Sequence, residues 1–296
     1  MNLNKCIGSI VGVAIGDCLG APVEFLQRGK FNVTTLKEDV CYTDDTAMTL
    51  CLADSLIRCK ENNIYDQLET YLKWLENGYM SCDGRVRGIG QTVLRSLVYY
   101  KKHKKIFTKN KNRLGNGGLM RIAPIAVFYR DDLYKAIKEA AISTYVTHSA
   151  KICLDVSMLY VGLIVGAING INKDELLSKD YINELLKIDY KFEIEVLDIF
   201  LGSYKEKSKD KIISSGFVLH TLESALWSFY NSDSFKESVI TAVNLGGDAD
   251  TIGAVCGMLS GAYYGYDNLH KDLRKIKNFD TILDIAKLLF HISKKE

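Results

Sequence analysis

The apolar residues of this chain recur with the spacing of amphipathic helices along nearly its whole length. The pattern at i, i+3 and i+4 covers residues 4–19, 44–60, 64–76, 88–100, 118–128, 132–146, 149–168, 173–187, 217–230, 234–243, 250–264 and 280–293. Strand-like alternation is scarce, and residues 31–36 are the best strand candidate. With two prolines and no Pro/Ser-rich linker, the chain is expected to form one all-α domain over residues 1–296.

Two of the expected helices carry glycine at every fourth position. These are Gly8, Gly12, Gly16 and Gly20 in the first helix, and Gly253, Gly257, Gly261 and Gly265 in the second. Residues four apart share one helix face. Glycine costs about 1 kcal/mol relative to alanine inside a helix, so the repetition needs a physical reason. A face without side chains lets helix backbones approach closely, and we expect close helix packing at both sets.

Composition describes a globular protein with a sizeable core, since 47% of the 296 residues are hydrophobic and 25% are charged. A net charge of +2 gives no electrostatic argument for binding nucleic acid. The cysteines form no CxxC pair and the histidines no HExxH motif, so we expect reduced cysteines, no zinc site and a cytoplasmic location. The longest apolar run, 13 residues at 156–168, is too short to cross a bilayer, and it indicates a buried helix and no membrane association.

Two acidic clusters, far apart in the chain, each begin a helix-patterned segment. The first contains Thr43, Asp44 and Asp45, and the second contains Asp248, Asp250 and Thr251. Carboxylates held close together repel, by about 4 kcal/mol for a pair about 4 Å apart near a protein surface. Such clusters are tolerated when they take up protons or bind cations, and oxygen ligands favour hard divalent ions. Capping of the two helices by Asp and Thr is the alternative explanation.

A glycine-rich turn at residues 115–118 begins another helical segment. Its backbone N–H groups can hold an anion such as phosphate, although Gly-Asn-Gly is also an ordinary turn. His148 begins the next long helix, where it either contacts such an anion or packs against its neighbours. The basic run at 101–105 is expected to be a solvated loop, with an acidic or phosphate-rich partner as the alternative.

Taken together, these motifs resemble the ADP-ribosylglycohydrolase family, which includes dinitrogen reductase-activating glycohydrolase and the ADP-ribosyl-acceptor hydrolases. The resemblance runs nearly from end to end. It rests on GVAIGDCLGAPVEF at 12–25, YTDDT at 42–46, GNGGLMRIAP at 115–124, THSA at 147–150 and NLGGDADTIGAVCGMLSGAYYG at 244–265. It implies an all-α enzyme whose cleft holds two divalent cations, Mg²⁺ or Mn²⁺, and hydrolyses the glycosidic bond between ADP-ribose and an acceptor.

Carried over residue by residue, the resemblance implies metal ligands at Thr43, Asp44, Asp45, Asp248, Asp250 and Thr251. It implies that Glu24 is the catalytic acid/base, although without the resemblance this residue would be interpreted as a surface glutamate after a helix end. It also implies an ADP-ribose cleft lined by Gly90, Asn116, Gly117, Gly118, Met120, Arg121 and His148. One position departs from the family, because Gly88 stands where many members have aspartate. Asp83 is expected to supply that carboxylate if its loop bends inward; otherwise the acceptor preference or the rate changes.

The most direct expectation is hydrolysis of ADP-ribosyl-arginine on a modified protein, and the choice of acceptor rests on the family alone. Two alternatives stay open. One is the same fold acting on ADP-ribosyl-serine or a small ADP-ribose conjugate. The other is a non-catalytic module that binds ADP-ribose. The intact acidic clusters and Glu24 favour an enzyme, whereas Gly88 keeps the binding module open.

Overall fold

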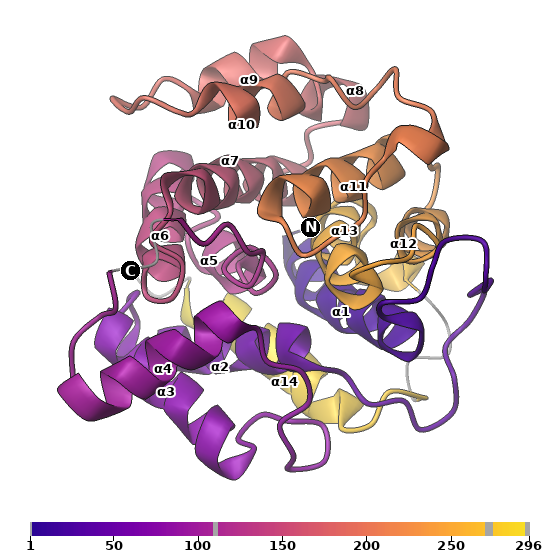
Figure 1. Cartoon of the computed structure of the whole chain (residues 1–296). Coiled ribbons are helices and arrows are strands. Elements are labelled where there is room, and N and C mark those ends of the chain that lie inside the picture. The colour runs from indigo at the N-terminus through magenta and orange to yellow at the C-terminus, as the bar shows by residue number, and fades with distance from the viewer. Residues whose placement is uncertain (1, 109–111, 270–274, 294–296) are drawn as a thin grey trace.

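The protein is all-helical in the part of the chain that the computed structural model describes, residues 2–108, 112–269 and 275–293. Those residues form fourteen α-helices and no β-strand (Figure 1), and two isolated bridges, Val40–Ile276 and Gly115–Phe217, are their only strand-like pairings. The predicted all-α fold class is therefore confirmed.

The helices follow the expected segments closely. They are α1 (Asn2–Gly20), α2 (Asp44–Cys59), α3 (Ile64–Asn77), α4 (Gln91–His103), α5 (Ala123–Phe128), α6 (Leu133–Tyr145), α7 (Lys151–Ile168), α8 (Lys173–Leu176), α9 (Lys179–Leu185), α10 (Ile194–Phe200), α11 (Val218–Tyr230), α12 (Phe235–Val243), α13 (Ala249–Tyr264) and α14 (Phe279–Ile292). Short 3-10 turns lie at Ala21–Val23, Lys209–Lys211 and Tyr266–Asn268. The expected helix at 173–187 is two helices, because Ser178 caps α9 by accepting a hydrogen bond from the Tyr181 N–H. Pro124 lies in the first turn of α5, so that helix begins later than expected.

The predicted strand at residues 31–36 is wrong, and a single side chain explains why. Asn244 accepts a hydrogen bond from the Val33 N–H at 2.9 Å and donates one to the Val33 carbonyl at 2.8 Å. These two bonds satisfy the backbone groups that a neighbouring strand would otherwise pair. The segment is therefore fixed to the end of α12 without forming a sheet.

The two glycine sets face one another along the antiparallel helices α1 and α13, which lie side by side in Figure 1. Gly12 lies against Gly257, with the pairs Gly8–Gly261 and Gly16–Gly253 on either side. A Cβ atom at any of these positions would overlap the opposing backbone. Close packing is therefore confirmed at these pairs, and it brings the end of α1 beside the start of α13.

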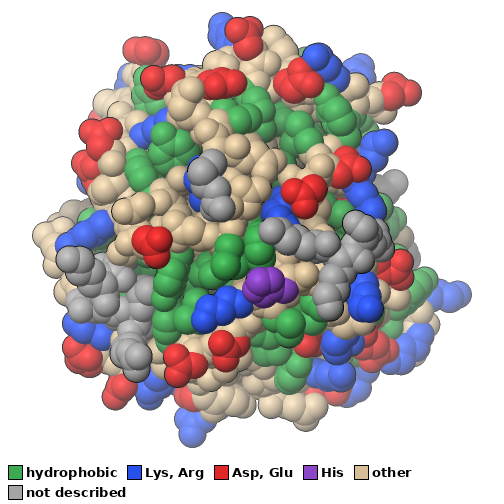
Figure 2. Space-filling model, turned by 180° about the vertical axis from the view of Figure 1, so that it is seen from behind, with side chains coloured by type: hydrophobic (Ala, Val, Ile, Leu, Met, Phe, Trp, Pro, Cys, Tyr) green, Lys and Arg blue, Asp and Glu red, His purple; other side chains and the backbone are tan. Residues whose placement is uncertain are grey.

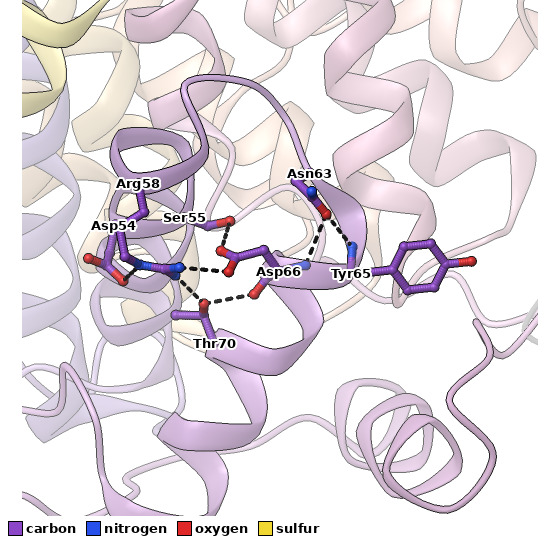
Figure 3. Close-up of polar contacts among 7 residues, drawn as sticks. All are labelled: Asp54, Ser55, Arg58, Asn63, Tyr65, Asp66 and Thr70. Atoms are coloured by element: carbon purple, nitrogen blue, oxygen red, sulfur yellow. Dashed lines mark hydrogen bonds and ion pairs between the residues drawn. The ribbon is translucent and has the colours of Figure 1, made fainter.

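A polar network fastens α2 to α3 at the end remote from Asp44 (Figure 3). Arg58 donates to Asp54 at 2.9 Å, to Asp66 at 2.6 Å and to Thr70 at 2.7 Å. Ser55 adds a 2.7 Å bond to Asp66. Because these bonds join two helices, they fix the direction of α2 and hence the position of its first turn.

The expectation that all cysteines are reduced is wrong for one pair. Cys41 and Cys82 form a disulfide, and their Cα atoms are 5.5 Å apart, within the range that a disulfide spans. The two residues are separated by 41 positions, so only the folded chain brings them together. The other six cysteines form no disulfide among the described residues. The cytoplasmic location was predicted partly because all cysteines were expected to be reduced. That reason no longer holds, and the location stays a prediction.

Two helices are long and apolar enough to cross a bilayer by length and composition alone, at Asn2–Val23 and Lys151–Ile168. The protein interior buries 89% and 83% of their apolar windows, respectively. The second contains the apolar run for which a buried helix was predicted.

On the face turned away from the viewer in Figure 1, acidic and basic side chains are both spread around apolar ones (Figure 2).

Candidate active site and metal centre

One cavity of about 440 Å³ is lined by Glu24, by Asp44 of the first cluster and by Asp248 of the second, whereas Asp45 and Asp250 are buried and do not line it. It is lined by Glu24, Phe25, Asp44, Gly88, Ile89, Gly90, Gln91, Thr92, Val93, Gly115, Asn116, Gly117, Met120, His148, Gly216, Asp248 and Thr251. The helices α2, α4, α11 and α13 all begin at or within two residues of this lining. Helix N-termini carry partial positive charge and free N–H groups, so the starts of α4 and α11, which have no acidic residue, suit an anionic group.

A second hollow of about 480 Å³ lies between α5 and the end of α14. Lys60, Asp131 and Lys135 are among its lining residues, and its charges are mixed in sign. None of the predicted site residues lines it. We therefore place the functional site in the cavity at the helix N-termini.

The first acidic cluster begins α2 but does not cap it. Thr43 is the N-cap residue, yet its side chain makes no capping hydrogen bond. Its hydroxyl lies 3.2 Å from Asp45 Oδ2 and 3.5 Å from Asp250 Oδ2. Asp45 Oδ1 is buried without a hydrogen-bond partner among the described residues. A buried carboxylate oxygen without a donor is costly, and a cation ligand is one way to satisfy it.

The second cluster shows the same departure from capping. Asp248 is the N-cap residue of α13 and makes no side-chain capping bond. Oxygen atoms of Asp248, Asp250 and Glu24 all lie within 4.8 Å of one another. Thr251 Oγ1 reaches Asp45 Oδ2 at 3.5 Å, which joins this cluster to the first. These residues make an all-oxygen donor set, and such sets select hard divalent cations.

Electrostatics at the two clusters supports the same interpretation. Burial, followed by the neighbouring charge of Asp17, raises the pKa of Asp44 to about 7. Burial and nearby carboxylates also raise the pKa values of Asp45 and Asp250 well above the usual range. Without a cation these groups gain protons to relieve repulsion, and a divalent ion relieves the same repulsion. The residues present therefore fit a divalent-cation site.

Glu24 is held beside the second cluster by a strained turn. Phe25 has φ of 62°, and its N–H donates to the Gly247 carbonyl at 2.6 Å. The Gly247 N–H donates back to Leu26 at 3.1 Å. A Cβ on Gly246 would crowd the Leu26 carbonyl, so the paired glycines allow the close approach. Burial, then Asp248 and then Asp17 raise the pKa of half-buried Glu24.

The residues expected to line the ADP-ribose cleft fall into two groups. Gly90, Asn116, Gly117, Met120 and His148 line the cavity. Asn116 Nδ2 also donates to Asp248 Oδ2 at 2.7 Å, which links the glycine-rich turn to the acidic cluster.

Arg121 and Gly118 lie behind the cavity lining. Fully buried Arg121 donates to the Gly117 carbonyl and to Thr147 Oγ1, each at 2.6 Å, and its guanidinium lies 4.8 Å from the Tyr71 ring centre. We therefore interpret Arg121 as a support for the turn. Burial, with a further contribution from Arg121, lowers the pKa of His148 to about 3, so its imidazole is neutral.

Gly88 lies directly over the first cluster, with φ of 67°. A Cβ at this position would overlap Asp44 Oδ1. The suggestion that Asp83 supplies the missing carboxylate is wrong, because Asp83 is exposed, binds Arg87 at 2.6 Å and does not line the cavity. The loop at residues 83–88 therefore directs the Asp83 side chain toward Arg87 at the surface and away from the cavity.

Sequence reasoning missed one buried member of the site, Asp17. This side chain has no exposed surface, and it accepts hydrogen bonds from the backbone and hydroxyl groups of Thr43 and Thr46. The available signal was an aspartate inside an apolar helical pattern, because a buried carboxylate requires donors. Other lining residues that were missed, Gln91 and Gly216, carried no comparable signal.

Fold and site together define an all-helical domain with a carboxylate-lined cleft suited to divalent cations. The sequence model of the ADP-ribosylglycohydrolase family matches residues 2–296. ADP-ribosylarginine hydrolase Tri1 of Serratia proteamaculans is 34% identical over all of this chain and 81% of its own length. The ADP-ribosyl-[dinitrogen reductase] glycohydrolase of Rhodospirillum rubrum is 29% identical over 90% of this chain and 87% of its own.

A solved structure described as an ADP-ribosylglycohydrolase-related protein complex superposes with a TM-score of 0.84. It is 30% identical and covers 99% of both chains. The chain belongs to the ADP-ribosylglycohydrolase family, and it is a hydrolase of that family.

Proposed function

We propose that this enzyme removes ADP-ribose from arginine side chains of modified proteins, with two divalent cations, Mg²⁺ or Mn²⁺, as cofactors. The observation that carries the proposal is the meeting of Glu24 with both acidic clusters at one cavity. The choice of arginine rests on the relatives of Serratia proteamaculans and Pseudomonas putida, both named ADP-ribosylarginine hydrolases and both matched over nearly all of this chain.

The proposed cation ligands are Thr43, Asp44, Asp45, Asp248, Asp250 and Thr251, as expected from the sequence. When bound, the cations would supply positive charge that polarises substrate and water oxygens. The carboxylates hold net negative charge around the ribose, which favours the positive charge that develops at C1″ as the glycosidic bond breaks. Asn116 holds the Asp248 carboxylate by its 2.7 Å bond, so this ligand keeps one orientation.

Glu24 is the proposed general acid and base. Its raised pKa favours the protonated form closer to neutral pH than for an ordinary glutamate. In the proposed reaction the bond between C1″ and the guanidine nitrogen breaks, and a water oxygen bonds to C1″. Glu24 takes a proton from that water and gives a proton to the leaving nitrogen, so free ADP-ribose and arginine result.

The remaining cavity residues bind and orient the ADP-ribose. Backbone N–H groups at the start of α4, beside Gly90, and in the turn at Gly117 suit the diphosphate. Neutral His148 offers a hydrogen bond without a charge, and Met120 supplies apolar contact. Arg121 donates a hydrogen bond to the Gly117 carbonyl from behind the cavity lining, so its proposed role is to keep the shape of the glycine-rich turn and not to contact the substrate.

Turnover of two matched peptides tests this proposal. One carries ADP-ribosyl-arginine and the other ADP-ribosyl-serine, and release of ADP-ribose is measured with Mg²⁺, with Mn²⁺ and with chelator. Cation-dependent hydrolysis of the arginine conjugate alone is the expected result. Faster hydrolysis of the serine peptide, or of a small ADP-ribose conjugate, would assign another linkage. Binding of ADP-ribose without any turnover would make the protein a binding module.

A further inference from the structure

Asp17 is a buried carboxylate surrounded by donors from a different helix. It lies within the apolar part of α1 and has no exposed surface. The Thr43 and Thr46 N–H groups donate to Asp17 Oδ2 at 2.9 and 3.1 Å. The Thr46 hydroxyl donates to the same oxygen at 2.6 Å, and the Thr43 hydroxyl donates to Oδ1 at 2.9 Å. Both oxygens of Asp17 therefore accept from the start of α2.

These bonds replace the cap that α2 lacks. The first N–H groups of a helix have no partner within it, and the N-cap side chain of α2 makes no capping bond. Asp17 satisfies two of these groups from α1. As a result, the position of the first turn of α2 depends on Asp17 in α1, the helix that packs against α13 through its glycines.

The bond to the Thr43 hydroxyl has a chemical consequence. A hydroxyl carries one proton, and as a cation ligand it must present a lone pair while that proton points elsewhere. Asp17 Oδ1 accepts at 2.9 Å, whereas Asp45 Oδ2 and Asp250 Oδ2 lie at 3.2 and 3.5 Å. The proton is therefore directed toward Asp17, and the lone pairs of Thr43 remain on the side of the acidic clusters.

We propose that Asp17 is a positioning residue that orients the Thr43 hydroxyl as a ligand for a divalent cation. The inference rests on the proposed cation site. Partners of a metal ligand typically change metal affinity or activity by about 10–100-fold when they are mutated. Asp17 suits this role because both of its oxygens accept, whereas an asparagine would turn an NH₂ group toward at least one donor.

Thr46 provides a matched control within the same network. Its hydroxyl bonds Asp17 at 2.6 Å and no other side chain among the described residues. The Thr46→Val variant removes one bond to Asp17 and leaves those of Thr43. It reports the effect of weakening the network on stability, without removing the bond that orients Thr43.

The experiment is calorimetric titration of Mg²⁺ and Mn²⁺ into the full-length parent, Asp17→Asn and Thr46→Val, each with a thermal melt. We expect Asp17→Asn to weaken cation binding by about 10–100-fold, and Thr46→Val to lower the melting temperature with cation affinity within about twofold of the parent. If Asp17→Asn does not fold, Asp17→Ser, which leaves room for a water molecule, is measured in the same way.

A double-mutant cycle with Thr43→Val locates the effect. If Asp17 acts through Thr43, Asp17→Asn should weaken cation binding little further when Thr43 is already valine. Parental affinity in Asp17→Asn, or equal losses in Asp17→Asn and Thr46→Val, would overturn this inference and leave the proposed function intact. Absence of cation binding in the parent would overturn both.

Discussion

At the scale of single residues, the site places half-buried Glu24 and Asp248 beside the buried Asp44, Asp45 and Asp250. Glu24 differs from its neighbours because a turn outside any helix holds it, whereas Asp44, Asp45 and Asp250 lie in first turns of helices. This difference is one reason to propose proton transfer for Glu24 and cation binding for Asp44, Asp45 and Asp250.

The Glu24→Gln substitution tests that separation. It keeps the size of the side chain but removes proton exchange, and we expect turnover to fall by about 10²–10⁴-fold. Melting temperature, ADP-ribose binding and cation affinity should stay near the parental values. Exposed Glu61, changed to Gln, is the matched control and should behave as the parent. A Glu24→Gln variant that hydrolyses at the parental rate would remove the acid/base role, and one that mainly loses cation affinity would make Glu24 a ligand.

The surroundings of Gly88 change the expected effect of a substitution at this position. From the sequence alone, the absent carboxylate implied a changed acceptor preference or rate, so Gly88→Asp would be expected to alter acceptor preference or raise turnover. A side chain there must adopt φ of 67° and overlap Asp44 Oδ1, so we now expect both Gly88→Ala and Gly88→Asp to displace Asp44. Turnover should fall by about 10–100-fold in each, since small misplacements at a reacting centre are costly. Steady-state rates distinguish the two expectations. A Gly88→Asp enzyme faster than the parent would show that the missing carboxylate limits the reaction.

At the scale of elements, the α1–α13 pair determines where the site forms. The glycine pairs set these helices so close that the end of α1, with Asp17, lies beside the start of α13, with Asp250. The sequence predicted close packing from spacing alone, because glycine inside a helix needs a reason. It did not predict that the two sets face each other, since spacing identifies a helix face but not its partner.

The Gly257→Ala and Gly257→Leu variants test the packing. Alanine favours helix formation by about 1 kcal/mol over glycine, so an exposed position would be stabilised. Here a Cβ overlaps the Gly12 carbonyl, and we expect alanine to lower the melting temperature and leucine to lower it further. Overpacking typically costs about 1–3 kcal/mol, and backbone contact raises that figure. Thermal melts equal to or above that of the parent would contradict close packing.

Other elements show which features of the fold the spacing of apolar residues predicts and which it does not. Long periodic segments such as α7 and α13 were predicted well, because many residues share one period. The seven-residue helix α10 was missed since it holds too few residues to establish a period. The Cys41–Cys82 pair and the role of Asp17 also depend on contacts between distant segments, which spacing along the chain does not encode.

At the scale of the whole molecule, the cavity concentrates negative charge at the N-terminal ends of helices. Burial raises the pKa of Asp17 to about 6 and that of Asp44 to about 7, and it also raises the pKa values of Asp45 and Asp250 well above the usual range. Each folded-state pKa exceeds that of an unfolded aspartate. The cation-free protein therefore gains stability from these groups at low pH and loses it as pH rises toward and past about 7.

This electrostatic balance predicts how cations stabilise the fold at different pH. His148 acts oppositely, because its pKa of about 3 lies below the unfolded value and its contribution is lost as pH falls. His148 is not a proposed cation ligand, so the difference between melts in Mg²⁺ and in chelator isolates the carboxylates. We expect that difference to be small near about pH 5 and large near about pH 8. An equal difference at both pH values would contradict the assignment of the clusters as cation ligands.

The central claim is that the two acidic clusters form one cation site, and the Asp250→Asn variant tests it most directly. Asp250 lies with Glu24 and Asp248 and also approaches Thr43 of the other cluster at 3.5 Å. Calorimetric titration of Mn²⁺ into the parent should give binding, and into Asp250→Asn should give binding weakened by at least about tenfold, with turnover reduced in parallel. The cation-free variant should melt no lower than the cation-free parent, because one repelling charge is gone. Equal Mn²⁺ affinity in the two proteins would contradict the account.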